Sequence, residues 1–269
     1  MTILDDLFVR LRAEKKKAFI PFVTAGDPSL EMTGKILQRL DSLGCSIAEV
    51  GVPYSDPIAD GPVIQASYTR ALGKGIKLKE IFETVKKVQP TVKMPLLTML
   101  SYAVVFRQGP ANFVKLAKEA GFCGAIIPDL LVEESDELSE ICRGEDFNLI
   151  QLVTPTTPRE RAVRIAQRSS GFIYFVSVTG ITGERQQLPA NLLEQVRWLR
   201  ERTDLPICIG FGISQPEHVR MLGPVADGLI VGSALVRRIA ESVAAGEQAV
   251  LTGVDELVSG LLKTLQEVS

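Results

Sequence analysis

The sequence contains little of what metal-dependent or nucleophilic catalysis usually requires. His218 is the single histidine among 269 residues, so a zinc site built on several histidines is excluded. His218 stands in Gln-Pro-Glu-His-Val-Arg, a stretch typical of the start of a surface helix, with no partnered nucleophile nearby. We therefore expect no catalytic role for it. The widely spaced cysteines form no CxxC pair and are expected to be reduced, buried thiols: Cys45, Cys123, Cys142 and Cys208.

Long apolar runs and an excess of one charge are also missing. The 30 basic and 32 acidic residues give a net charge of −2 and are mixed along the chain, with no basic block for nucleic acid. The longest apolar runs, such as residues 124–128, are about strand length and fall short of the ~20 residues that cross a bilayer. The first six residues carry acids where a secretory signal carries bases. These features predict a cytoplasmic protein without a nucleic-acid or membrane partner.

Short apolar runs rich in β-branched residues alternate about eight times with amphipathic helical stretches. This alternation predicts a parallel sheet covered on both faces. Eight strands and the chain length favour an α/β fold of the closed (β/α)8, or TIM barrel, type. The first strand is followed by Thr-Ala-Gly-Asp-Pro, which lacks the GxGxxG of an open dinucleotide-binding sheet. The predicted strands are residues 19–24, 47–52, 96–100, 125–128, 149–153, 172–177, 207–210 and 228–231.

Helix ends can be predicted as well. Asp27-Pro28 suggests a cap followed by proline at the first helical position, and Thr157-Pro158 suggests the start of a capping box. Residues 3–14 and 254–268 are predicted to form extra helices at the termini. No linker or low-complexity segment divides the sequence, so residues 1–269 are expected to form one domain.

The most unusual polar segment follows the second predicted strand. Glu49 interrupts an apolar strand, and the loop up to Pro62 holds Asp56 and Asp60 among prolines and glycines. A buried carboxylate is costly unless it has partners or a task, and apolar surroundings raise its pKa so that it can accept and release a proton. We expect Glu49 and Asp60 to be catalytic; the alternative is a solvated loop beside a chance glutamate.

Glycine-rich turns follow the last three predicted strands. They contain Thr182 and Gly183 after the sixth strand, Gly212 after the seventh, and Gly232 with Ser233 after the eighth. Such loops form the usual phosphate site of this fold, because glycine lets amide groups approach an anion and a helix start adds partial positive charge. Ser233 can also cap its helix. Ordinary turn glycines are the alternative, and the absence of a Walker sequence disfavours a nucleoside triphosphate.

Apolar residues near the predicted strand ends suggest a flat slot beside the phosphate site. Each alone is more often a core residue than a ligand contact, but together they suit a substrate with an aromatic head and a phosphate tail. They are Phe22, Leu100, Tyr102, Ile126, Tyr174 and Phe211.

Five segments together resemble the signature segments of the tryptophan synthase alpha subunit family. They are residues 19–28, 49–62, 179–183, 210–214 and 231–233. The similarity extends over essentially the whole chain, and 49–62 is its most specific part. The family cleaves indole-3-glycerol phosphate to indole and glyceraldehyde 3-phosphate in a retro-aldol reaction, without a metal or organic cofactor. The resemblance implies the same activity here.

The resemblance also implies a role for individual residues. Glu49 matches the general acid-base, Asp60 the carboxylate that binds the indole N–H, and Tyr174 a tyrosine near both. Thr182 matches a threonine of a mobile loop that orders Asp60 when the site closes. The matching phosphate contacts are Gly183, Gly212, Gly232 and Ser233, and the matching indole pocket is formed by Phe22, Leu100, Ile126 and Phe211.

The family usually works beside a beta subunit that carries pyridoxal phosphate, so the resemblance implies that partner and no cofactor in this chain. Pro53, Asp56 and residues 130–134 match interface positions, whereas residues 101–104 lack the asparagine that the family commonly has there. Three alternatives stay open. They are a stand-alone indole-releasing lyase, a silent barrel that binds the substrate only to activate a beta subunit, and an unrelated phosphate-binding barrel such as an isomerase.

Overall fold

The computed structural model describes residues 1–58, 60–177, 192–210 and 212–269. Its strands are β1 (Ala18–Thr24), β2 (Ala48–Gly51), β3 (Leu96–Met99), β4 (Phe122–Ile126), β5 (Asn148–Ile150), β6 (Leu152–Val153), β7 (Ile173–Val176), β8 (Ile207–Gly210) and β9 (Gly228–Val231). Every pairing among them is parallel, and their order in the sheet is β5-β4-β3-β2-β1-β9-β8-β7-β6.

Strands β5 and β6, which stand at the two ends of this order, are two halves of one barrel strand. Only Gln151 separates β5 from β6; β5 pairs with β4 on one side and β6 pairs with β7 on the other. The amide of Tyr174 donates to the carbonyl oxygen of Gln151 at 3.1 Å, so the ladder continues across the break. The nine segments therefore form eight barrel strands that close on themselves, and the predicted (β/α)8 barrel is confirmed.

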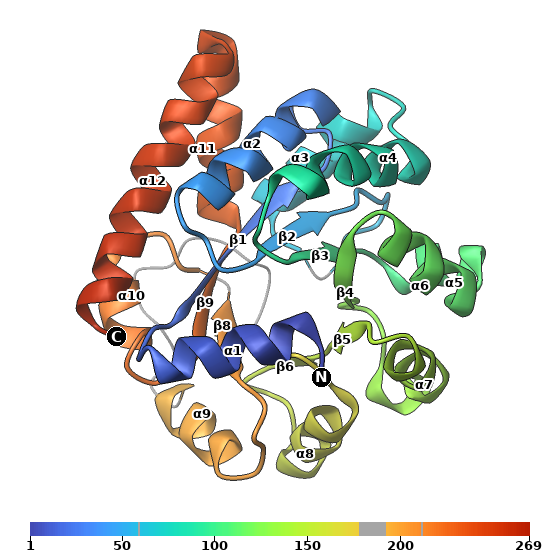
Figure 1. Ribbon diagram of the computed structural model, residues 1–269, viewed down its shortest axis with the longest axis vertical. Helices are drawn as coiled ribbons and strands as arrows, with labels where there is room; N and C mark the ends of the chain where they lie inside the picture. The colour runs from blue at the N-terminus through green and yellow to red at the C-terminus, as the bar shows by residue number, and fades with distance from the viewer. Residues whose placement is uncertain (59, 178–191, 211) are drawn as a thin grey trace.

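Helices surround the strands (Figure 1). They are α1 (Ile3–Ala13), α2 (Leu30–Ser42), α3 (Pro62–Leu72), α4 (Leu78–Val88), α5 (Tyr102–Gln108), α6 (Pro110–Glu119), α7 (Asp136–Gly144), α8 (Arg159–Arg168), α9 (Leu192–Arg200), α10 (Pro216–Leu222), α11 (Ser233–Ser242) and α12 (Glu247–Glu267), with 3-10 turns η1 (Gln89–Thr91), η2 (Val132–Glu134) and η3 (Val243–Ala245). Within the described ranges, no helix combines the length and apolar character needed to cross a membrane.

Alternation along the strands divides the buried side chains into two layers. In β3, Leu97 and Met99 belong to the cluster inside the barrel, whereas Leu96 and the following Leu100 belong to the cluster between strands and helices. Successive strand residues point to opposite faces, which explains this division. Glu49 pairs in register with Leu97 and so points into the barrel.

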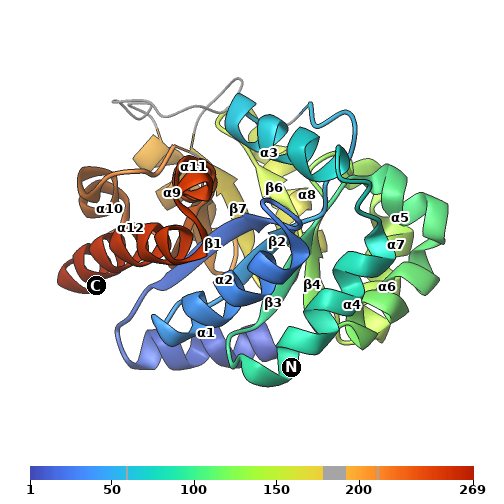
Figure 2. The ribbon, with the colours of Figure 1, turned by 90° about the horizontal axis from the view of Figure 1, so that it is seen from above.

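The ends of the barrel are covered by different helices, and Figure 2 shows α1 and α3 on opposite sides of it. Leu4 and Phe8 of α1 join the inner cluster, and the Phe8 ring lies 5.9 Å from that of Phe172. The opposite helix, α3, is fastened to β1, because the hydroxyl oxygens of Thr24 and Ser67 are 2.6 Å apart. The end under α3 is thus the one where polar side chains can meet.

The two predicted helix caps are wrong. Helix α2 begins at Leu30, and the Ser29 hydroxyl, not Asp27, accepts the hydrogen bond that caps it. The Asp27 carboxylate instead accepts two hydrogen bonds from Arg70 of α3, at 2.6 and 3.0 Å. Thr157 lies one residue before the N-cap of α8, Pro158, so its hydroxyl serves the preceding turn.

His218 and the cysteines also occupy specific places. His218 is buried rather than on the surface, and its Nδ1 accepts a hydrogen bond from the amide of Ser214 at 3.3 Å. All four cysteines are free thiols; Cys123 alone is partly exposed. Burial raises the pKa of Cys45 to about 12, so that thiol stays protonated at neutral pH.

Two glycines, one in strand β4 and one on the exposed face of α12, test this packing. A Cβ added at Gly124 would lie 2.7 Å from the carbonyl oxygen of Asn148 in the paired strand, whereas one added at Gly260 of α12 meets nothing within 4 Å. We expect Gly124→Ala to lower the free energy of unfolding by about 1–3 kcal/mol. Gly260→Ala should raise it by about 0.5–1 kcal/mol, as in an exposed helix interior. Urea titration measures both, and equal effects of the two substitutions would contradict the packing described.

Candidate active site

A cavity with about 480 Å³ of empty space, including its open mouth, lies where the barrel strands end beneath α3. Strands β1, β2, β3 and β7, helix α3, the loop after β8 and the start of α11 contribute to its wall. The residues that line it are Phe22, Glu49, Asp60, Ile64, Met99, Tyr174, Gly212, Ile213, Gly232, Ser233 and Ala234.

Glu49 is a carboxyl group inside the barrel. Its side chain is fully buried, and neither carboxylate oxygen has a hydrogen-bond partner among the described residues. Burial alone raises the pKa of Glu49 well above its ordinary value, because a charge without partners is strongly disfavoured in an apolar interior. The raised pKa favours the protonated form of the side chain, whose proton can be transferred to a bound molecule.

Asp60 faces the same cavity from the loop that precedes α3. Its carboxylate oxygen Oδ2 accepts a hydrogen bond from the Tyr54 hydroxyl at 3.4 Å. Its main chain is held on both sides: the amide donates to the carbonyl of Pro57 at 3.1 Å, and the carbonyl accepts from the Gln65 side chain at 2.8 Å. Burial raises the pKa of Asp60 to about 6, opposed by the Tyr54 hydrogen bond and assisted by the charge of Asp129.

The start of α11 supplies the cavity with amide groups. Gly232 is the N-cap and makes no side-chain capping bond, and Ser233 is the first helical residue rather than the cap that we predicted. The first amides of a helix lack partners within it and carry partial positive charge. Gly212, on the facing loop, has a φ of 79°, a conformation that glycine adopts readily. This end of the cavity suits an anion such as phosphate.

Glycines in the neighbouring strands make room for two aromatic rings. A Cβ on Gly51 would lie 2.3 Å from the tip of the Phe22 ring, and one on Gly210 would lie 2.5 Å from the Tyr174 hydroxyl. Either side chain would displace the ring that it meets. Both rings line the cavity beside the carboxyl groups of Glu49 and Asp60.

The structure distributes the other predicted apolar residues differently. Leu100 packs in the cluster outside the strands, Tyr102 begins α5, and Ile126 is buried in the inner cluster without lining the cavity. Met99 and Ile64, which we did not predict, do line it. The strand register could have identified Met99, since it lies two residues beyond the partner of Glu49. Predicted residues Thr182, Gly183 and Phe211 lie outside the described part of the chain.

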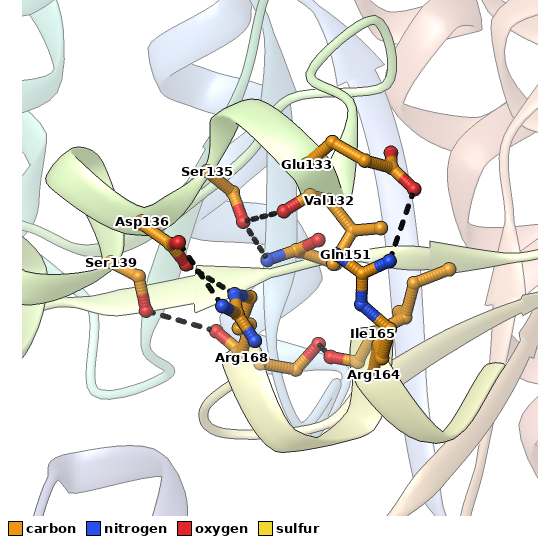
Figure 3. A network of polar contacts seen from close by, with 10 residues as sticks. Val132, Glu133, Ser135, Asp136, Ser139, Gln151, Arg164, Ile165 and Arg168 are labelled. Carbon is orange, nitrogen blue, oxygen red and sulfur yellow. Dashed lines mark hydrogen bonds and ion pairs between the residues drawn. The ribbon is translucent and has the colours of Figure 1, made fainter. Parts of the chain in front are cut away.

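The predicted interface residues lie on the outside of the barrel. Pro53 and Asp56 line a hollow between the loop after β2 and α5, where Pro53 is buried and Asp56 is exposed. The nearby turn η2 is held by buried polar groups, shown in Figure 3. The Gln151 amide donates to the Ser135 hydroxyl at 3.2 Å, and that hydroxyl donates to the carbonyl of Val132 at 2.9 Å. Gln151, at the break between β5 and β6, thereby holds the turn η2 in place.

The described residues include no cluster of three or more histidine, cysteine, aspartate or glutamate side chains that could hold a metal ion. The cavity itself offers a buried acid with a raised pKa, a second carboxylate and a helix start whose amides suit an anion.

Comparison with known proteins shows which family this chain resembles in sequence. The family model described as tryptophan synthase alpha chain matches residues 8–265. The tryptophan synthase alpha chain of Rhodopirellula baltica is 57% identical over 258 residues, which cover 95% of this chain and 92% of that protein. That of Arabidopsis thaliana is 43% identical, with 89% and 87% covered.

Solved structures of tryptophan synthase chains are also similar to this chain. The tryptophan synthase subunit alpha of Legionella pneumophila str. Paris has a TM-score of 0.91 at 32% identity, covering 99% of both chains. A chain of the tryptophan synthase complex of Pyrococcus furiosus has a TM-score of 0.84 at 36% identity, covering 92% of this chain and 99% of that one. The chain therefore belongs to the tryptophan synthase alpha chain family.

Proposed function

We propose that Glu49 and Asp60 perform the alpha reaction of tryptophan synthase in this chain: the cleavage of indole-3-glycerol phosphate to indole and glyceraldehyde 3-phosphate. The observation that carries the proposal is the Glu49 carboxyl, which is buried without a partner in the cavity that Asp60 and the start of α11 also line. A proton donor, a fixed charge and an anion site are the three things that this lyase reaction needs.

Glu49 makes both proton transfers in this scheme. Its raised pKa keeps it protonated, so it can protonate C3 of the indole ring. The resulting carboxylate then takes the proton from the hydroxyl on the adjoining glycerol carbon. That carbon becomes the aldehyde, the carbon–carbon bond breaks, and its electron pair returns to the ring to release indole. Glu49 ends the cycle protonated, as it began.

Asp60 supplies the fixed negative charge. With a pKa of about 6, most of its carboxyl population is ionised at neutral pH. Protonation at C3 places positive charge on the ring nitrogen, and a carboxylate that accepts the N–H stabilises that charge in the transition state. The phosphate of the substrate binds the amides at Ser233 and near Gly212, which orients the ring towards Glu49.

We further propose that this reaction requires neither a metal nor an organic cofactor in this chain, since its steps are proton transfers beside a fixed charge. A beta subunit is the partner, and we place its contact at Pro53, Asp56 and residues 130–134. We assign one domain to residues 1–269, supported by the packing of α1 in the inner cluster and of α12 against α11. The four free thiols, three of them buried, suit a cytoplasmic location.

Replacing Glu49 with glutamine tests the proton shuttle. Glu49→Gln puts a neutral amide where a neutral acid stands, so we expect the fold and substrate binding to persist. General acid-base groups contribute ~10²- to 10⁴-fold to rate, and because one residue makes two transfers, we expect a loss of kcat at the upper end of that range. Indole release under saturating substrate measures it, and turnover near that of the parent would remove the mechanism.

Placing a charge at the start of α11 tests the phosphate site. Ser233→Asp should raise KM by about 10- to 100-fold through repulsion of the phosphate. It should also stabilise the helix by about 0.3–1 kcal/mol, because acids favour the first turn. Ser233→Ala, which loses only a hydroxyl, is the matched control with a smaller effect. An unchanged KM in Ser233→Asp contradicts the proposed orientation of the substrate.

The remaining alternatives are separated by assaying the purified chain with and without a beta subunit. Rapid indole release by the chain alone would identify a stand-alone lyase. No release under either condition, together with a faster beta reaction, would identify a silent activator. A catalytic alpha subunit paired with a beta subunit should release indole faster when the partner is present.

A further inference from the structure

The carboxylate of Asp60 is held by a tyrosine that the reaction scheme does not use. Tyr54 lies six residues earlier in the same loop, is only partly exposed, and donates its hydroxyl to Oδ2 of Asp60 at 3.4 Å. The bond is long for a neutral donor and a carboxylate, and catalytic hydrogen bonds are often long before a substrate is bound. Tyr54 is therefore placed to act on Asp60 without contacting the proton shuttle.

The ring of Tyr54 is itself fixed by a second tyrosine. Tyr68 of α3 packs against it with ring centroids 5.4 Å apart and planes inclined by 56°. Tyr68 is 1% exposed, and its hydroxyl occupies space that a side chain on Gly51 would take, 3.0 Å from the position of a Cβ there. Tyr54 precedes Asp60 in the loop, and Tyr68 follows it on α3, which starts two residues after Asp60. The contact between the two rings therefore joins the segments on both sides of the carboxylate.

We propose that Tyr54 is a positioning residue for Asp60: its hydroxyl orients the carboxylate towards the cavity and favours the charged form, and Tyr68 keeps that hydroxyl in place. The inference rests on the proposed function, since it assigns Tyr54 a role only if Asp60 acts as the fixed negative charge. It goes further by stating how that charge is maintained in a buried site.

The groups around Asp60 show why a donor is needed. Among the described residues, those that interact with it are Tyr54 in its own loop, Tyr68 on α3, Tyr174 on β7 and Asp129 after β4, and Glu49 on β2 lines the same cavity. None of these is a cation, and Asp129 disfavours a second negative charge. Burial raises the pKa of Asp60 to about 6, and the Tyr54 hydrogen bond is the influence that lowers it.

The direction of the pH effect follows from this balance. A hydrogen bond to the ionised carboxylate lowers its pKa, so removing the Tyr54 hydroxyl raises the pKa of Asp60 further. A larger fraction of Asp60 is then protonated and inactive near neutral pH. Raising the pH restores the charge, so the loss of activity is reversed at alkaline pH.

The test is the pH dependence of kcat in Tyr54→Phe, which keeps the ring and its contact with Tyr68. We expect the midpoint of the acid limb to move up by about 1–2 pH units, the effect of one hydrogen bond to a charged group. Activity should fall by about 2- to 10-fold at pH 7, as the ionised fraction of Asp60 falls, and return to the parent value at higher pH. Thermal unfolding of each variant verifies that the fold is retained.

Thr98→Val is the matched control. Thr98 is fully buried with an unpartnered hydroxyl among the described residues, but it alternates with the inward-facing Leu97 and Met99 and so faces the helices. Its loss should leave the acid limb unchanged. An unshifted limb in Tyr54→Phe, or a loss that alkaline pH does not restore, overturns the positioning role. Either result leaves the proposed function standing, because Glu49→Gln tests that separately.

Discussion

The structure depends on one unfavourable placement: a carboxyl group inside a closed barrel with no hydrogen-bond partner among the described residues. Glu49 points inward because it alternates with Ala48 and Val50, whose side chains pack against the helices. An ionised carboxylate there lacks a compensating partner, so burial raises the pKa of Glu49 and favours its protonated form. The apolar core that stabilises the barrel thus also raises the pKa of the acid that we propose as the proton donor of the lyase reaction.

The second carboxyl group differs because its surroundings differ. Asp60 lies in a loop, reaches a tyrosine hydroxyl and has a pKa of about 6, while Glu49 reaches no partner in the part of the chain that the structure describes. Two acids that line one cavity thus titrate differently, and we propose one as the proton donor and the other as the fixed charge. Tuning by environment rather than by residue type is a general route to acid-base catalysis at neutral pH.

Periodicity and composition allowed the strands to be predicted from the sequence. Features that depend on contacts between distant residues were predicted wrongly or missed. The strands 207–210 and 228–231 match β8 and β9, since each is an apolar run with clear ends. Asp27 was predicted as a cap because nothing local reveals its distant partner Arg70. Leu100 was predicted to line the cavity because it lies near a strand end and matches the family's indole pocket, but it packs in the cluster outside the strands. Gln151 gave no local sign that it divides the fifth strand.

The protonation state of Glu49 at neutral pH is the most direct test of this mechanism. Infrared spectra of the parent and Glu49→Gln, recorded across a pH titration, isolate the carboxylic acid band of that single residue in their difference. We predict that the band persists at pH 7, far above the value of ~4.3 at which an unperturbed glutamate titrates. A band that disappears near that ordinary value would show that Glu49 is ionised in the resting protein and would contradict its role as the proton donor.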